Sequence, residues 1–212
     1  MKDWSFDNNW TDELETDIEQ DSNLEDLRDK QYRSYYNKTY QVIKEVNQIG
    51  MPGKGEQLRL ITFRPFNSAV FLAYICEHEI IEELYIAVFS FNYEACQLLV
   101  QKINEGKIKK VIILMSNYRN AAYRLKEQLT NEILKDHKNV ELFFCHSHAK
   151  IISMKTSEGN YYHIEGSGNM TFSARVEQYI IDNDKGLFDF TKGWFTEIKV
   201  FLKGKKELVL TN

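Results

Sequence analysis

Five polar side chains lie close together in this chain, and four of them can bind or attack a phosphate. His148 and Lys150 stand two residues apart, and the segment Gly166-Ser167-Gly168-Asn169 and Glu177 follow within about thirty residues. An imidazole can act as nucleophile or acid–base group, whereas an ammonium, a hydroxyl and an amide can donate hydrogen bonds to an anion. The two glycines allow a backbone to approach an anion closely. These residue types predict a phosphate site that contains a nucleophile.

The residues around this cluster predict that it lies on neighbouring strands. Residues 149–154 form an apolar run typical of a strand, so His148 and Lys150 should point to the same side of a sheet. Residues 156–160 are polar and include Gly and Asn, as in a hairpin turn, and residues 161–165 should return as the partner strand. We therefore expect this hairpin to bring residues 166–169 to the end of the sheet where His148 lies.

In this order the residues resemble the signature of the phospholipase D superfamily, which is H-x-K, four residues, Asp, six residues and G-S-x-N. The matching positions are His148, Lys150, Gly166, Ser167 and Asn169, and Glu177 stands where many bacterial members carry a carboxylate. Lys155 occupies the position of the Asp, and the spacing from His148 to Gly166 is four residues longer than usual, which the hairpin turn can absorb. The resemblance spans about residues 56–212 and implies an α/β fold, a mixed sheet with helices on both faces.

The resemblance also implies a mechanism, phosphodiester transfer through a covalent phosphohistidine without a metal or another cofactor. His148 would be the nucleophile, and Lys150 and Asn169 would hold the non-bridging oxygens. Ser167 would donate a hydrogen bond to the phosphate or to its neighbours, and Glu177 would accept one from the other ring nitrogen of a His148. The chemistry needs two histidines and this chain has one H-x-K motif, so the resemblance implies a homodimer with one composite site.

Other polar residues near the motifs have more than one interpretation. With Gly166 and Gly168, His146 and Arg175 complete the expected substrate-binding set, although Arg175 can equally pair with a carboxylate of the protein. His146, Cys145 and His163 raise the alternative of a zinc site, but four regularly spaced ligands are lacking and we expect no metal. We expect His163 to be structural, and Lys155 to be either solvated or in contact with a phosphate backbone.

Charge is distributed unevenly along the chain. Residues 1–30 carry eleven acidic and three basic residues, which predicts a disordered arm or, alternatively, an acidic arm that competes with nucleic acid. The whole chain has 27 basic and 31 acidic residues, so residues 31–212 hold 24 and 20 and carry a net charge of +4. A basic body suits a polyanionic substrate.

Hydrophobic patterning divides the rest of the chain into a helix and one α/β domain. Aromatic and apolar positions spaced by three and four predict a helix within residues 31–50, and a glycine-rich break precedes the domain at 56–212. Within that domain we expect strands near 58–63, 84–91, 110–115, 140–145 and 177–182, and helices near 68–78, 93–104, 120–135 and 188–201.

The composition also narrows the class of substrate. The chain has no run of eighteen apolar residues and no apolar leader at its start, and its three cysteines are odd in number, which favours reduced thiols in a cytoplasm. We therefore expect a DNA endonuclease without contact to membranes, with DNA favoured over RNA and contacts mainly to the backbone. The alternatives are a catalytically silent module that binds nucleic acid or protein, and a phospholipid hydrolase.

Overall fold

The structure, a computed structural model, describes residues 32–37, 49–62, 67–116, 137–171, 176–204 and 209–210. The predicted arm at 1–30, the predicted helix at 120–135 and Arg175 lie outside the described residues. No helix in the described ranges is both long enough and apolar enough to span a membrane.

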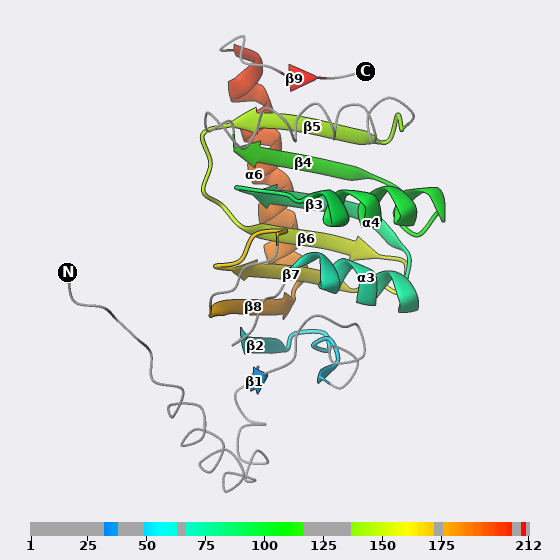
Figure 1. Ribbon diagram of the computed structural model, residues 1–212, viewed down its shortest axis with the longest axis vertical. Coiled ribbons are helices and arrows are strands. Elements are labelled where there is room, and N and C mark those ends of the chain that lie inside the picture. Colours follow the sequence, from blue (N-terminus) through cyan, green and yellow to red (C-terminus); the bar gives the residue numbers. More distant parts are fainter. Residues whose placement is uncertain are drawn as a thin grey trace, which may run out of the picture. The chain divides into compact units, whose positions relative to one another are not determined.

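The described strands form one mixed sheet with the order β1-β2-β8-β7-β6-β3-β4-β5-β9 (Figure 1). Strands β3, β4 and β5 run parallel to one another, whereas β2, β8, β7, β6 and β3 are each antiparallel to the next. The bounds are β1 Tyr32–Asn37, β2 Gln57–Thr62, β3 Ile81–Val88, β4 Val111–Ser116, β5 Val140–Cys145, β6 Ile151–Thr156, β7 Tyr161–Gly166, β8 Glu177–Asn183 and β9 Val209–Leu210. The sheet changes from parallel to antiparallel pairing at β3.

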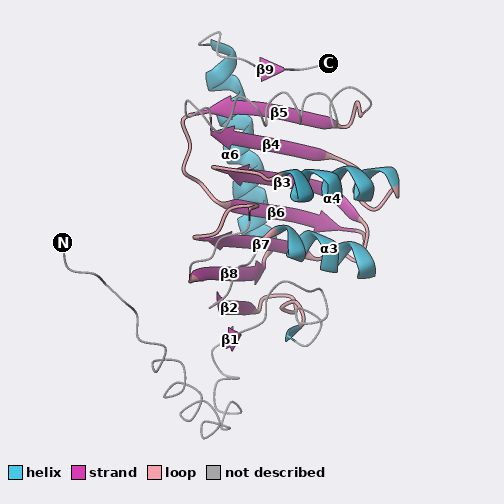
Figure 2. Ribbon diagram, in the orientation of Figure 1, coloured by secondary structure: helices cyan, strands magenta, loops and turns pink. Residues whose placement is uncertain are grey.

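Helices cover both faces of this sheet, as Figure 2 shows. Helices α3 (Ala69–His78) and α4 (Tyr93–Asn104) pack on one face, and α6 (Lys185–Gly204) packs on the other. Because side chains alternate along a strand, Leu84 and Ile86 of β3 enter the first core, whereas Tyr85 packs edge-on against Phe195 of α6 at 5.3 Å. The predicted α/β class with helices on both faces is confirmed.

Most predicted elements are present, with three differences. Residues 32–37 are a strand where we expected the first part of a helix. Tyrosine favours strands, and the spacing of the tyrosines there fits both the helical and the strand repeat. Strand β3 ends at Val88 instead of continuing to residue 91. Strand β6 begins at Ile151, so His148 and Lys150 precede it in the connecting segment and do not lie on the strand.

The predicted hairpin joins β6 to β7. Ile151 pairs with Glu165 and Lys155 with Tyr161, and Gly159 in the turn has a φ of 73°, a left-handed conformation that glycine adopts without strain. The three cysteines are free, Cys76 and Cys96 are buried, and Cys145 is half-buried. Burial raises the pKa of the Cys76 thiol to about 12, so this thiol stays protonated at neutral pH.

Candidate functional site

The predicted phosphate-binding residues meet at one edge of the sheet, where the parallel strands end (left in Figure 1). Because β6 is antiparallel to β3 and β7, the segment before β6 lies at the same edge as the ends of β3 and β7 and the start of β8. Ligands of open α/β sheets bind at such carboxyl ends, next to the point where the strand order changes. His148, Gly166 and Glu177 are therefore brought to this edge by the pairing of the strands.

His148 and Lys150 lie side by side just before β6. The Lys150 Nζ donates to the backbone carbonyl of His148 at 3.2 Å, and the Gly166 N–H donates to the carbonyl of Lys150 at 3.4 Å. The exposed imidazole of His148 packs against the ring of Phe89, with 4.7 Å between ring centroids and 39° between ring planes. An imidazole and an ammonium thus share the open edge of the sheet.

The side chain of Asn169 is held by the backbone that follows β3. Its Oδ1 accepts hydrogen bonds from the N–H groups of Phe89 at 3.1 Å and Ser90 at 3.2 Å. Its backbone carbonyl accepts from the Ser68 hydroxyl at 3.2 Å, at the start of α3. Because the amide oxygen already has two donors, only the NH₂ group can act on a ligand, and that group is a donor. The orientation of the Asn169 amide is therefore set by these two backbone donors.

Ser167 and Glu177 form a pair across β7 and β8. The Ser167 hydroxyl donates to the Glu177 Oε2 and accepts from the Gln178 N–H at 3.0 Å. Glu177 is only 8% exposed, so its carboxylate needs such a donor. A serine hydroxyl has one hydrogen, and here it goes to Glu177. In this geometry Ser167 orients Glu177, and its expected hydrogen bond to phosphate or to the neighbours of the phosphate stays a prediction.

Gly166 and Gly168 are explained by packing inside the protein. A Cβ on Gly166 would lie 2.4 Å from the carbonyl oxygen of Gln178, and one on Gly168 would lie 1.9 Å from the Tyr179 hydroxyl. Neither glycine has a positive φ. The missing side chains therefore leave room for β8, a reason that differs from the close approach of an anion predicted from the sequence.

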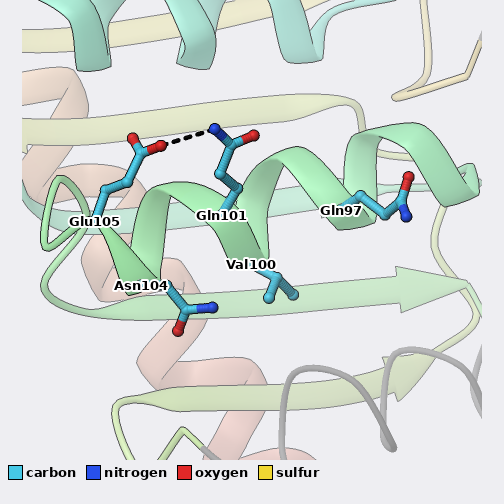
Figure 3. A pocket seen from close by; sticks show the side chains of 5 residues that line it. All are labelled: Gln97, Val100, Gln101, Asn104 and Glu105. Atoms are coloured by element: carbon cyan, nitrogen blue, oxygen red, sulfur yellow. Dashed lines mark hydrogen bonds between the residues drawn. The ribbon is translucent and has the colours of Figure 1, made fainter.

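A hollow of about 340 Å³ lies directly beside Lys150. Its floor includes Ile151, Glu165 and Ile180, which pair in one row across β6, β7 and β8. A larger hollow of about 700 Å³ runs along α4, where Gln101 donates to Glu105 at 2.7 Å (Figure 3). The described lining of this larger hollow contains no imidazole, thiol or ammonium, so of these two hollows the one beside Lys150 is the better candidate for a phosphate ligand.

The remaining candidates are spread around this site. His146 is exposed in the segment between β5 and β6. His163 is 2% exposed, with Nε2 2.8 Å from Glu165 Oε1 and Nδ1 3.2 Å from Thr191 Oγ1, so both of its ring nitrogens are occupied. This confirms the structural role expected for His163. Among the residues that the structure describes, no three His, Cys, Asp or Glu side chains form a group that could hold a metal.

Lys155, at the position of the signature Asp, lies away from the site. It is one residue from the end of β6, and its Nζ is 2.5 Å from Glu82 Oε2 on the neighbouring strand. Lys155 is four positions after Ile151 along the strand, a span of roughly 13 Å. The structure therefore favours a solvated ion pair over a contact with phosphate.

Sequence reasoning missed the residues that hold Asn169. Phe89 and Ser90 were expected inside a strand, where their N–H groups would bond a neighbouring strand. The strand ends at Val88 because these N–H groups turn to Asn169, about eighty residues later in the chain. The local pattern of apolar residues carries no signal for such a long-range contact.

Comparisons with known proteins identify the fold. No family model and no curated protein matches the sequence. The structure is similar to Nuc, a phospholipase D family member from Salmonella typhimurium, with a TM-score of 0.50, 19% identity, and 67% of this chain and 93% of Nuc covered. Phosphatidylserine synthase from Haemophilus influenzae gives a TM-score of 0.45, 12% identity, and coverage of 73% and 42%.

Yeast tyrosyl-DNA phosphodiesterase gives a TM-score of 0.33, 14% identity, and coverage of 48% of this chain and 25% of the yeast protein. Of these three, Nuc alone reaches a TM-score of 0.50, and at 19% identity the likeness establishes a common architecture.

Proposed function

We propose that this chain, which has the phospholipase D superfamily fold, is a metal-independent phosphodiesterase that cleaves DNA through a phosphohistidine. The observation that carries the proposal is the fixed amide of Asn169 at the same sheet edge as His148 and Lys150. Two backbone N–H groups hold the oxygen of this amide, so its NH₂ group is pre-organised to donate to an oxyanion. Such pre-organised donors lower the barrier of phosphoryl transfer.

The reaction has two displacements at phosphorus. A ring nitrogen of His148 attacks the phosphorus, the bond to the leaving oxygen breaks, and a second, protonated imidazole gives its proton to that oxygen. A water molecule then attacks the phosphorus, the N–P bond breaks, and the second imidazole takes a proton from the water. The two imidazoles start in opposite protonation states and both return to them.

The surrounding groups supply charge and orientation. Lys150 and Asn169 would hold the non-bridging oxygens, and the ammonium of Lys150 would supply the positive charge that a divalent ion supplies elsewhere. Glu177, held by Ser167, would accept from the second ring nitrogen of a His148 and fix its tautomer. His146, Arg175 and the hollow beside Lys150 are candidates for contacts to the rest of the substrate.

The second imidazole would come from a second copy of the chain. The sequence contains one H-x-K motif, so two His148 side chains can meet only across an interface between subunits. A two-fold axis near the sheet edge would place both at one composite site. Mixing wild-type subunits with an excess of His148→Ala subunits should lower cleavage, because each mixed site lacks one imidazole, whereas independent sites would leave the wild-type activity unchanged. Sedimentation equilibrium should show a dimer at assay concentration.

DNA is the substrate that the charge distribution favours. Residues 31–212 carry a net charge of +4, which attracts a polyanion, and phosphate contacts alone give binding with little sequence preference. Binding should therefore weaken steeply as salt increases. RNA and phospholipid vesicles are tested in the same assay as alternative substrates.

The decisive experiment is cleavage of plasmid and single-stranded DNA in excess EDTA. Wild type should cleave, whereas His148→Ala and Lys150→Ala should not. His137→Ala and Lys155→Ala are matched controls, because His137 precedes β5 and Lys155 lies near the end of β6, both at the opposite edge of the sheet. Loss of cleavage in EDTA, or unchanged cleavage by His148→Ala, would refute the mechanism.

A catalytically silent module that binds nucleic acid is the second candidate. The replacement of the signature Asp by Lys155 motivates it, but Lys155 pairs with Glu82 away from the phosphate-binding residues. If no variant cleaves any substrate while fluorescence anisotropy shows tight, salt-sensitive DNA binding, this second candidate replaces the first.

A further inference from the structure

We infer that Phe89 is a positioning residue for the nucleophile, although it belongs to neither sequence motif. Its ring packs against the imidazole of His148, and its backbone N–H donates to the side chain of Asn169. One residue thereby sets the position of the attacking group relative to a group that holds the phosphate. This inference rests on the proposed function and names a further residue of that same site.

Phe89 is itself firmly anchored. It directly follows Val88, which is 1% exposed at the end of β3. On its other side, Ser90 also donates to Asn169, Phe91 forms a parallel bridge with Met170, and the Asn92 N–H donates to the carbonyl of Met170 at 2.9 Å. The backbone segment that carries the ring is therefore held on both sides of Phe89.

A ring contact suits this histidine better than a hydrogen bond would. The proposed reaction uses both ring nitrogens, because one attacks the phosphorus and the other is held by Glu177. A hydrogen bond that oriented the ring would occupy one of them. The ring contact with Phe89 restrains the exposed imidazole without taking up either ring nitrogen in a hydrogen bond.

The contact also strengthens as the reaction proceeds. When the N–P bond forms, the imidazole of His148 gains positive charge. The face of a phenyl ring is electron-rich and attracts a cation, so Phe89 interacts more strongly with the transition state than with the neutral ground state. An interaction of this kind raises kcat and leaves substrate binding nearly unchanged.

The test compares Phe89→Leu and Phe89→Tyr with wild type in the EDTA cleavage assay. Phe89→Leu should lower kcat about tenfold, the size expected for an aromatic pair, with KM within about twofold of wild type. Phe89→Tyr keeps the ring and should stay within about twofold in both constants. Phe190→Leu is the matched control, because Phe190 is 72% exposed on α6 and should have no effect.

A second readout does not depend on activity. Ring protons of His148, assigned by their loss in His148→Ala, should resonate upfield in wild-type NMR spectra because Phe89 shields them, and Phe89→Leu should remove this shift. Unshifted His148 signals in wild type would overturn the ring contact. Cleavage by wild type with an unchanged kcat in Phe89→Leu, or with only KM altered, would overturn the positioning role alone. A wild type that cleaves no phosphodiester would overturn the proposed function and this role together.

Discussion

Replacing Gly168 by alanine should destabilise the fold, because the space that its side chain would need is already occupied. The new Cβ would lie 1.9 Å from the hydroxyl oxygen of Tyr179 and 2.8 Å from its Cζ. Tyr179 is 2% exposed and meets the ring of Phe71 edge-on at 5.4 Å, so it cannot swing away freely. Either the loop or the tyrosine ring must move.

The size of the effect follows from this overlap. Inserting an atom into a packed interior destabilises by about 1–3 kcal/mol, and we expect about 2 kcal/mol here. For a chain of this length, that corresponds to a melting temperature lower by roughly 4–8 °C. The measurement is urea unfolding followed by tryptophan fluorescence, together with thermal unfolding followed by circular dichroism.

Two further variants separate the contact from a general effect of alanine. Tyr179→Phe in the Gly168→Ala background removes the atom at 1.9 Å and leaves the ring carbon at 2.8 Å, so part of the stability should return. Gly193→Ala on α6 meets nothing within 4 Å and should stabilise, by about 0.5–1 kcal/mol, since alanine favours a helix. If Gly168→Ala unfolds at the wild-type urea concentration, or if Tyr179→Phe recovers nothing, packing against β8 does not explain this glycine.

Three more outcomes follow from the described contacts. Asn169→Asp should lower kcat/KM at least about a hundredfold in the cleavage assay while the protein stays folded, because a carboxylate replaces the donor that we propose for the phosphate. A normal kcat/KM in Asn169→Asp would show that its NH₂ group does not hold an oxygen. Lys155→Asp should not raise the cleavage activity and should destabilise the fold by less than about 1 kcal/mol, because the ion pair with Glu82 is exposed. Adding Glu82→Lys should restore this stability, because it reforms the ion pair with the charges exchanged. In native protein at pH 8, iodoacetamide should modify the half-buried Cys145 long before Cys76, since burial raises the pKa of the Cys76 thiol to about 12. Peptide mass spectrometry measures this order, and equal rates would contradict it.

The fold could be predicted largely because its strands are buried on both faces. Residues 84–88 of β3 and 111–115 of β4 read as continuous apolar runs, β5 is interrupted only by Glu141, and the apolar spacing of α6 marks its buried side. The prediction of a helix within residues 31–50 was wrong for residues 32–37, which form β1. The spacing of the tyrosines in so short a segment fits a helix and a strand equally well. Pairing with distant strands, which decides between the two, is absent from a local pattern.

The candidate site could be predicted as a set of residues but not as a set of contacts. The motifs named His148, Lys150, Ser167, Asn169 and Glu177, and strand pairing brings their segments to one edge. Their partners could not be predicted, because the donors to Asn169 come from Phe89 and Ser90 in a distant part of the chain. The roles of these five residues stay predictions until the variants are tested.

The clamp between residues 89–92 and 169–170 also bears on when the chain could become reactive during its synthesis. A ribosome completes residue 89 well before residue 169, so the groups that hold Asn169 exist early but lack their partner. Asn169 can be fixed only after β6 and β7 have been made and have docked beside β3. A nascent or truncated chain that ends before residue 169 would lack this fixed donor. The nuclease that we propose would therefore lack its fixed oxyanion donor until residue 169 has been made and the strands have docked.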